Sequence, residues 1–148
     1  MKRNPALKAL SIDHHHGLVL AHKAKKAAAQ ELSGNELQAV WAQLQEHADA
    51  VLAAHFEIEE SYLAPALSAC GDTHLDQLVD RLYKEHASLR SLLSPDSNRN
   101  TANLQSLGEL LERHIRFEER ELFEAALTAL DEDTLQAIAS ACDARHNG

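Results

Sequence analysis

The sequence predicts an all-α protein, an antiparallel up-down four-helix bundle with a short C-terminal fifth helix. Apolar residues recur with helical spacing, and no convincing alternation of period two appears. The helical segments are long and their connections are short, as is typical of antiparallel bundles. A chain of 148 residues can also bury a sizeable core without disulfides, so we expect a single domain over residues 1–148.

The first two helices each have one apolar stripe that also contains histidine. The first begins near Pro5, which a first helical turn tolerates, and ends at Ser33-Gly34-Asn35. Asn35 is the expected N-cap of the second helix, and Pro65 should kink or end that helix because proline removes a helical hydrogen bond. The two stripes are Leu7, Leu10, His14, Leu18, Ala21, Ala28 and Leu32, and then Leu37, Val40, Leu44, Val51, His55, Glu59 and Leu63.

The second half of the chain repeats this arrangement. After a turn at 70–72, Thr73 can cap a third helix, and the clearest loop covers residues 94–101. A fourth helix is expected over 102–129, and Asp131 or Asp133 can start the fifth. The stripes are Leu75, Leu78, Val79, Leu82, His86, Leu89 and Leu93, and then Leu104, Leu107, Leu111, His114, Glu118 and Leu122.

Composition narrows the class of protein. The formal net charge of -9 argues against a nucleic-acid surface. No stretch is long and apolar enough for a membrane span, and the first residues do not read as a signal peptide. Cys70 and Cys142 show no metal-binding or redox spacing. We therefore expect a cytoplasmic protein with free thiols.

Two copies of the pattern His-x-x-x-Glu are the strongest chemical signal. His55 precedes Glu59 by four residues, and His114 precedes Glu118 by four. Residues at this spacing share one face of a helix, about 6 Å apart along its axis, so both side chains can reach one metal or two adjacent metals. An acid-histidine pair precedes each copy, at 13–14 and 85–86, which gives a weak internal repeat.

The four helices together therefore predict a buried metal site. Buried carboxylates are unfavourable without a cation, and four buried histidines are difficult to satisfy by hydrogen bonds among themselves. Imidazoles and carboxylates without a thiolate suit iron, manganese or zinc. Six donors exceed what one tetrahedral zinc needs, so two ions bridged by Glu59 and Glu118 use them better. The predicted ligands are His14, His55, Glu59, His86, His114 and Glu118.

Several positions remain open at this stage. His15 is the main rival of His14 in the first helix. His22 and His47 are either surface histidines or a second metal site. Glu60 and Glu119 are expected in solvent or around the site rather than as ligands, and we expect the aromatic residues to shield the site as core: Trp41, Phe56, Tyr62 and Phe117.

The four motifs resemble those of the hemerythrin-like family, which has the HHE cation-binding domain. They are Asp13-His14, His55 to Glu60, Glu85-His86 and His114 to Glu119, in this order along most of the chain. The resemblance implies a four-helix bundle with a carboxylate-bridged pair of non-haem irons that can bind dioxygen. It also implies the same six ligands, with zinc or manganese as less favoured occupants.

The chain departs from the oxygen carriers of that family. Those proteins supply two histidines from the third helix, whereas the positions around His86 at that spacing are Leu82 and Arg90. They also place the last carboxylate five residues after its histidine, at Glu119 here, while wider bacterial branches use the spacing of Glu118, which we prefer. Tyr83 or Glu85 are the candidates to replace the missing histidine.

Three functions follow as hypotheses. The first is a di-iron protein that binds dioxygen, nitric oxide or peroxide, for sensing, storage, redox chemistry or iron handling. The second is a di-iron oxidase, peroxidase or nitric-oxide-handling enzyme, because a missing ligand leaves an open position. The third is an interaction module that metal binding stabilises without ligand chemistry. A metal- and oxygen-binding protein is favoured over a dedicated enzyme, and the sequence leaves a homodimer open.

Overall fold

The protein is a helical bundle, seen in a computed structural model that describes the backbone of residues 5–147 and the side chains of residues 7–144. No strand occurs in residues 5–147. The second and fourth long helices each contain consecutive α and π segments. The elements are α1 (Pro5–Ala29), α2 (Gly34–His47), η1 (Ala48–Leu52), α3 (Ala53–Ile58), η2 (Glu59–Leu63), α4 (Ala64–Ser68), α5 (Thr73–Leu93), α6 (Thr101–Phe117), η3 (Glu118–Leu122), α7 (Phe123–Ala129) and α8 (Glu132–Asn147).

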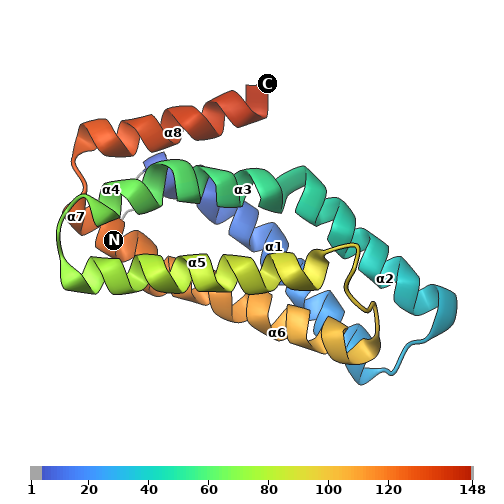
Figure 1. The fold of residues 1–148 in the computed structure, drawn as a ribbon. Helices are drawn as coiled ribbons and strands as arrows, with labels where there is room; N and C mark the ends of the chain where they lie inside the picture. The colour runs from blue at the N-terminus through green and yellow to red at the C-terminus, as the bar shows by residue number, and fades with distance from the viewer. Residues whose placement is uncertain (1–4, 148) are drawn as a thin grey trace.

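The four long helical stretches run up and down as predicted (Figure 1). α1 lies along α6, and α5 lies between α4 and α6. α8 lies outside the four-helix arrangement and packs across α1, α3 and η2. It has 16 residues and so is longer than the short fifth helix that the sequence predicted.

The apolar core consists of two clusters. One contains Leu10, Leu63 and Leu82, and the other contains Trp41, Leu89 and Leu111. Along α1, α5 and α6, the buried histidines fall between residues of the first cluster and residues of the second. The two clusters therefore enclose a polar layer across the middle of the bundle.

α1 and α6 approach each other closely because small residues line their contact. A Cβ atom at Gly108 would lie 2.8 Å from Cγ of Lys25, 3.0 Å from the backbone oxygen of Ala21 and 3.2 Å from Cβ of Ala24. All three distances are shorter than ordinary van der Waals contacts, and the backbone oxygen cannot move aside easily. Glycine at 108 thus sets the spacing between the helix that provides His14 and the helix that leads to Glu118.

Both glutamates of the His-x-x-x-Glu patterns begin a π-helical turn. The backbone N–H of Ala64 bonds to the oxygen of Glu59, and that of Phe123 bonds to the oxygen of Glu118. Each bond spans five residues, one more than in an α-helix. Pro65 was predicted to kink or end the second long helix, and it does not end it, because the helix continues through Pro65 to Ser68. Pro65 stands in the first turn after the π segment, where a proline is tolerated.

Helix caps differ from the sequence prediction at two places. The N-cap of α5 is Asp72, whose carboxylate accepts a hydrogen bond from the N–H of Leu75 at 3.1 Å, instead of Thr73. The N-cap of α2 is Ser33 instead of Asn35, and it makes no side-chain cap bond. The expected loop before α6 is confirmed, and Asp131 caps α8 through the N–H of Thr134. Neighbouring polar residues compete for such positions, and backbone geometry decides between them.

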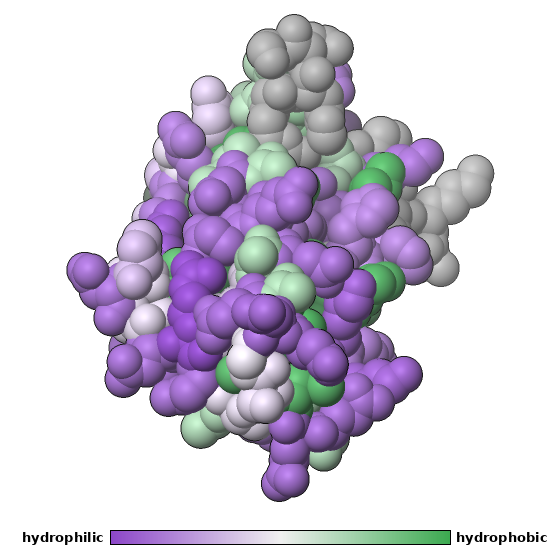
Figure 2. Space-filling view, turned by 90° about the vertical axis from the view of Figure 1, so that its right-hand side faces the viewer, coloured by the Kyte–Doolittle hydropathy of each residue, from purple (hydrophilic) through white to green (hydrophobic). Residues whose placement is uncertain are grey.

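The surface is mostly hydrophilic. Seen from the right-hand side of Figure 1, apolar side chains form small separate patches among polar ones (Figure 2). In the described part of the chain, no helix has both the length and the hydropathy to span a membrane. Tyr62 is 46% exposed, so the expectation that it belongs to the core is wrong, whereas Trp41, Phe56 and Phe117 are buried.

Candidate metal centre

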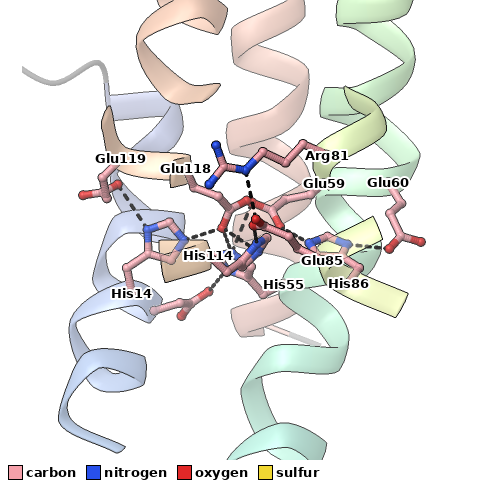
Figure 3. A network of polar contacts seen from close by, with 11 residues as sticks. His14, His55, Glu59, Glu60, Arg81, Glu85, His86, His114, Glu118 and Glu119 are labelled. Carbon is pink, nitrogen blue, oxygen red and sulfur yellow. Dashed lines mark hydrogen bonds and ion pairs between the residues drawn. The ribbon is translucent and has the colours of Figure 1, made fainter. Parts of the chain in front are cut away.

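Six buried polar side chains converge in the middle of the bundle (Figure 3). They come from all four long helical stretches and are the six residues that the sequence singled out. The potential ligand atoms fall into two groups, and within each group they lie within 4.8 Å of one another. The groups are His14, His55, Glu59 and Glu118, and then Glu59, His86, His114 and Glu118.

The two glutamates connect the groups. Oε1 of Glu118 lies 2.7 Å from Nε2 of His14 and 3.4 Å from Nε2 of both His55 and His114. Glu59 lies between His55 and His86, with its oxygens 3.3 Å and 3.1 Å from the respective Nε2 atoms. Each carboxylate thus contacts histidines of both groups, as a bridging ligand would.

The other nitrogen of every histidine in the centre faces a further carboxylate. Nδ1 of His14 lies 3.1 Å from Glu119, and Nδ1 of His55 lies 3.0 Å from Asp13. Nδ1 of His86 lies 2.6 Å from Glu60, and Nδ1 of His114 lies 2.7 Å from Glu85. We call these four acids the outer carboxylates: Asp13, Glu60, Glu85 and Glu119. They fix the ring orientations, as is typical around metal-binding histidines.

Each outer carboxylate is the sequence neighbour of one residue in the centre, but it contacts a histidine from a different helix. Asp13 of α1 contacts His55 of α3, and Glu85 of α5 contacts His114 of α6. Glu60 connects η2 to α5, and Glu119 connects η3 to α1. The contacts therefore form a closed ring around the bundle. The sequence showed the acid-histidine pairs, but it could not show which histidine each acid holds.

The protonation states of this arrangement require a cation. A neutral imidazole has only one N–H, yet all four rings face carboxylates at both nitrogens. Burial lowers the pKa of His14 and of His114, which disfavours their doubly protonated forms. Burial also acts on His55, but Glu59 and Asp13 outweigh it and raise the pKa of His55 to about 9. A cation between the rings would balance the buried carboxylates Glu59 and Glu118 that face them.

Three carboxylates in and around the centre have lowered pKa values. Burial alone would raise the pKa of Glu59, but the neighbouring His55 and His86 hold it well below its usual range. The pKa of Glu60 is lowered against burial by His86 and Arg90, and that of Glu85 is lowered by His114 and Arg81. Ionised acids can only accept hydrogen bonds, so Nδ1 of His86 and of His114 can donate to Glu60 and Glu85. With Nδ1 as the donor, a metal ion in the centre would take the lone pair of Nε2 in each ring.

Several buried polar atoms of the centre make no hydrogen bond, and this shows whether a metal ion would fit there. Oε2 of Glu59, Oε2 of Glu118 and Nε2 of His114 are buried and make no hydrogen bond in the described structure. Two of them have only a long ionic contact, at 3.3 Å from Glu59 to His55 and at 3.4 Å from His114 to Glu118. Ionised oxygens and an imidazole lone pair are unfavourable in such a place unless a cation is bound. The donor set contains nitrogen and oxygen and no thiolate, which suits iron, manganese or zinc. These residues therefore fit a metal centre.

The structure also separates residues that are neighbours in the sequence. His14 is 4% exposed and points into the centre, whereas His15 and His16 are exposed. Glu118 belongs to both groups, and Glu119 lies outside them against Nδ1 of His14. Neither candidate for an additional ligand belongs to the groups: Tyr83 donates to the backbone oxygen of Glu60, and Glu85 holds His114.

His22 and His47 do not contribute to the centre. His22 is exposed, and His47 is half-buried with Nε2 enclosed by protein. Burial lowers the pKa of His47, against the charge of Asp13. Among the described residues, the two groups of the centre are the only sets of three or more potential ligands at metal-binding distance. The structure thus gives no third ligand for a site at His22 and His47.

Aromatic rings cover the centre. The Phe56 ring stacks on His86 with centroids 3.9 Å apart, and Phe123 stacks on His14 at 5.2 Å. Phe117 lies 6.4 Å from His114. The sequence did not single out Phe123, although it stands five residues after Glu118 and so lies one π-helical turn further along. These rings limit contact between the polar layer and water.

Comparison with known proteins agrees with this geometry. The family model for the hemerythrin HHE cation-binding domain matches residues 6–126, which include all six residues of the centre and the four outer carboxylates. No curated protein matches the chain. No solved structure matches it either.

Proposed function

Since this chain belongs to the hemerythrin HHE cation-binding domain family, we propose that it is a non-haem di-iron protein that binds dioxygen or a related small molecule. Nitric oxide and peroxide are the related molecules, and the role is sensing, storage, redox chemistry or iron handling. The ligands in this proposal are His14, His55, Glu59, His86, His114 and Glu118.

The observation that carries the proposal is the pair of ligand groups that share Glu59 and Glu118. A single ion uses one group and leaves two histidines of the other without a cation. Two adjacent ions would use every donor. Each ion would have the two imidazoles of one group, and Glu59 and Glu118 would offset part of the positive charge of the two ions. Six donors exceed the needs of one tetrahedral zinc ion, which favours two ions, and the choice of iron rests on the hemerythrin family to which the chain belongs.

Bound iron would supply reversible redox chemistry and positions for a small ligand. Each group has four donor side chains, fewer than the six ligands of octahedral coordination. The helix α5 contributes only His86, because Leu82 is buried in the apolar core and Arg90 binds Glu60. No further His, Cys, Asp or Glu among the described residues joins either group, which leaves room for an external ligand.

The chain's own residues prepare this site in two ways. The outer carboxylates hold the imidazole rings by Nδ1 and keep Nε2 directed at the centre. Phe56, Phe117 and Phe123 keep water away from the polar layer. Preoriented donors in a dry cavity favour retention of the metal and limit loss of the oxidised form.

Metal analysis joined to visible spectroscopy tests the proposal. Protein from iron-replete cells is expected to contain about two irons per chain, as the two ligand groups imply, and its spectrum should respond to air, azide and nitric oxide. His86→Ala should lose this response. His74→Ala is the matched control, because His74 is an exposed histidine of the same helix.

Two results would contradict the proposal. One is an iron-loaded protein whose spectrum ignores all three small molecules. The other is a single zinc per chain with a large rise in melting temperature and no redox response. That second result would indicate a metal-stabilised interaction module instead.

A second candidate is a di-iron oxidase, peroxidase or nitric-oxide-handling enzyme. The presence of only one histidine from α5 favours it, because an open position next to His86 permits turnover. Repeated reduction of peroxide or nitric oxide by the reduced protein, lost in His86→Ala, would support this candidate. Reaction limited to one equivalent per site would exclude it.

A further inference from the structure

A small pocket lies on the side of the bundle between the second long helix and the C-terminal half of α5. Its volume is about 150 Å³. Its buried walls are the apolar side chains of Ala48, Leu52 and Leu93, and its rim contains Ala53 and the polar residues Gln45, Asp49 and Arg90. An apolar hollow of this kind is a favourable place for a small uncharged molecule.

Phe56 lies between this pocket and the metal centre. The ring lines the pocket, and it is 2% exposed. It also stacks on His86 with a centroid distance of 3.9 Å and meets His114 edge-on at 5.9 Å. One aromatic ring is thus in contact with both the pocket and the two histidines of one ligand group.

Arg90 connects the rim of the pocket to the same histidine. Its guanidinium carbon lies 5.4 Å from the centroid of the Phe56 ring. Its Nη1 donates to Oε2 of Glu60 at 2.7 Å, and that oxygen accepts from Nδ1 of His86 at 2.6 Å. Arg90 therefore contacts both Phe56 and Glu60, the two residues that link the pocket rim to His86 in these contacts.

A second hollow near the centre differs in character. It lies beside α5 and is lined entirely by polar or charged side chains: Gln77, Asp80, Arg81, Lys84 and Glu85. Glu85 contacts His114, but it is also tied to Nε of Arg81 at 2.9 Å. A polar lining of this kind suits water and ions, so the pocket at Phe56 is the better route for an apolar gas.

We propose that the pocket at Phe56 is the entry site for a small uncharged ligand such as dioxygen or nitric oxide, and that the Phe56 ring is the gate to the His86–His114 side of the centre. This inference rests on the proposed function. It adds the route of the ligand and the side on which the ligand arrives. In this proposal the Phe56 ring, which is buried and stacked on His86, must turn aside to open the route, while the helices keep their positions.

Xenon binding tests the pocket without any metal. Xenon is apolar and similar in size to the proposed ligands, and apolar cavities bind it. In the metal-free protein, xenon is expected to give saturable shifts of the methyl resonances of Leu52 and Leu93. Ala53→Phe places a ring at the rim and should abolish these shifts. Ala50→Phe is the matched control, since Ala50 is an exposed alanine of the same helix that lines a different hollow.

Rapid mixing of the reduced iron protein with each gas tests the route. Ala53→Phe is expected to slow the association of dioxygen and of nitric oxide by about tenfold, with an unchanged final amplitude. Ala50→Phe should leave both rates as in the parent protein. Phe56→Leu, which removes the flat ring but keeps the site apolar, should raise both rates.

The outcomes distinguish the entry route from the proposed function. Absence of xenon shifts at Leu52 and Leu93 overturns the pocket as a gas site. Equal rates for Ala53→Phe and Ala50→Phe, in a parent protein that does react, overturn the entry route alone. A parent protein that holds two irons and reacts with neither gas rejects the proposed function, and the entry route with it.

Discussion

The carboxylate of Asp13 lies 3.0 Å from Nδ1 of His55, a residue of another helix. Asp13 is 6% exposed and His55 is 1% exposed, so the contact is shielded from water. It joins the first long helix to the second at the level of the candidate metal centre. The same kind of contact recurs three more times around the bundle, which makes the outer carboxylates part of both the fold and the site.

Replacement of one outer carboxylate should weaken metal binding without removing a ligand. Asp13→Ala leaves Nδ1 of His55 without its acceptor and frees the ring to rotate. Loss of such a partner typically lowers metal affinity by roughly 10–100-fold. Competition with a chelator measures the change, and Asp80→Ala, an exposed aspartate of α5, is the control. An affinity equal to that of the parent protein would show that Asp13 does not position His55.

The adjacent acids Glu118 and Glu119 should differ in their importance for metal binding. Glu118 is 0% exposed and contacts histidines of both ligand groups. Of the four histidines in the centre, Glu119 is seen to contact His14, through Nδ1. Glu118→Gln is therefore expected to lose more than the roughly 10–100-fold typical of an outer partner, and Glu119→Gln should stay within that range. Iron content after dialysis against a chelator measures both. The reverse order would assign the ligand to Glu119.

Gly108→Ala should destabilise the bundle, because the new methyl group meets the backbone oxygen of Ala21 at 3.0 Å. Overpacking of this kind typically costs about 1–3 kcal/mol. Urea unfolding of the metal-free protein measures the loss. Ser106→Ala, at an exposed position of the same helix, is the control. Unchanged stability of Gly108→Ala would mean that α1 and α6 can separate without loss of packing.

Asp72→Ala should cost about 1 kcal/mol of unfolding free energy, because it removes the acceptor for the N–H of Leu75 at the start of α5. Thr73→Ala at the adjacent exposed position should change stability by less than about 0.5 kcal/mol. Thermal unfolding of the two variants side by side makes the comparison. A larger loss of stability in Thr73→Ala than in Asp72→Ala would show that Thr73 is the N-cap, as the sequence predicted.

Local periodicity determined much of the fold and of the candidate site. The helix that contains His114 and Glu118 could be recognised from its apolar stripe, since spacing within one helix follows from its geometry alone. The same reasoning placed His55 beside Glu59, because residues four apart share a face. All six predicted side chains therefore lie on the buried faces of their helices, and the structure brings them together.

Only the tertiary structure decided which residues meet across helices. The partner of Asp13, the side of the centre that Phe56 covers and the exposure of Tyr62 depend on the rotation and offset of packed helices, which no single helix determines. The π turns at Glu59 and Glu118 change that offset by one residue, and their positions could not be predicted from propensity. The sequence by itself therefore determined the helices and the donors, and the packing of the helices decided how the donors are held and which side chains cover them.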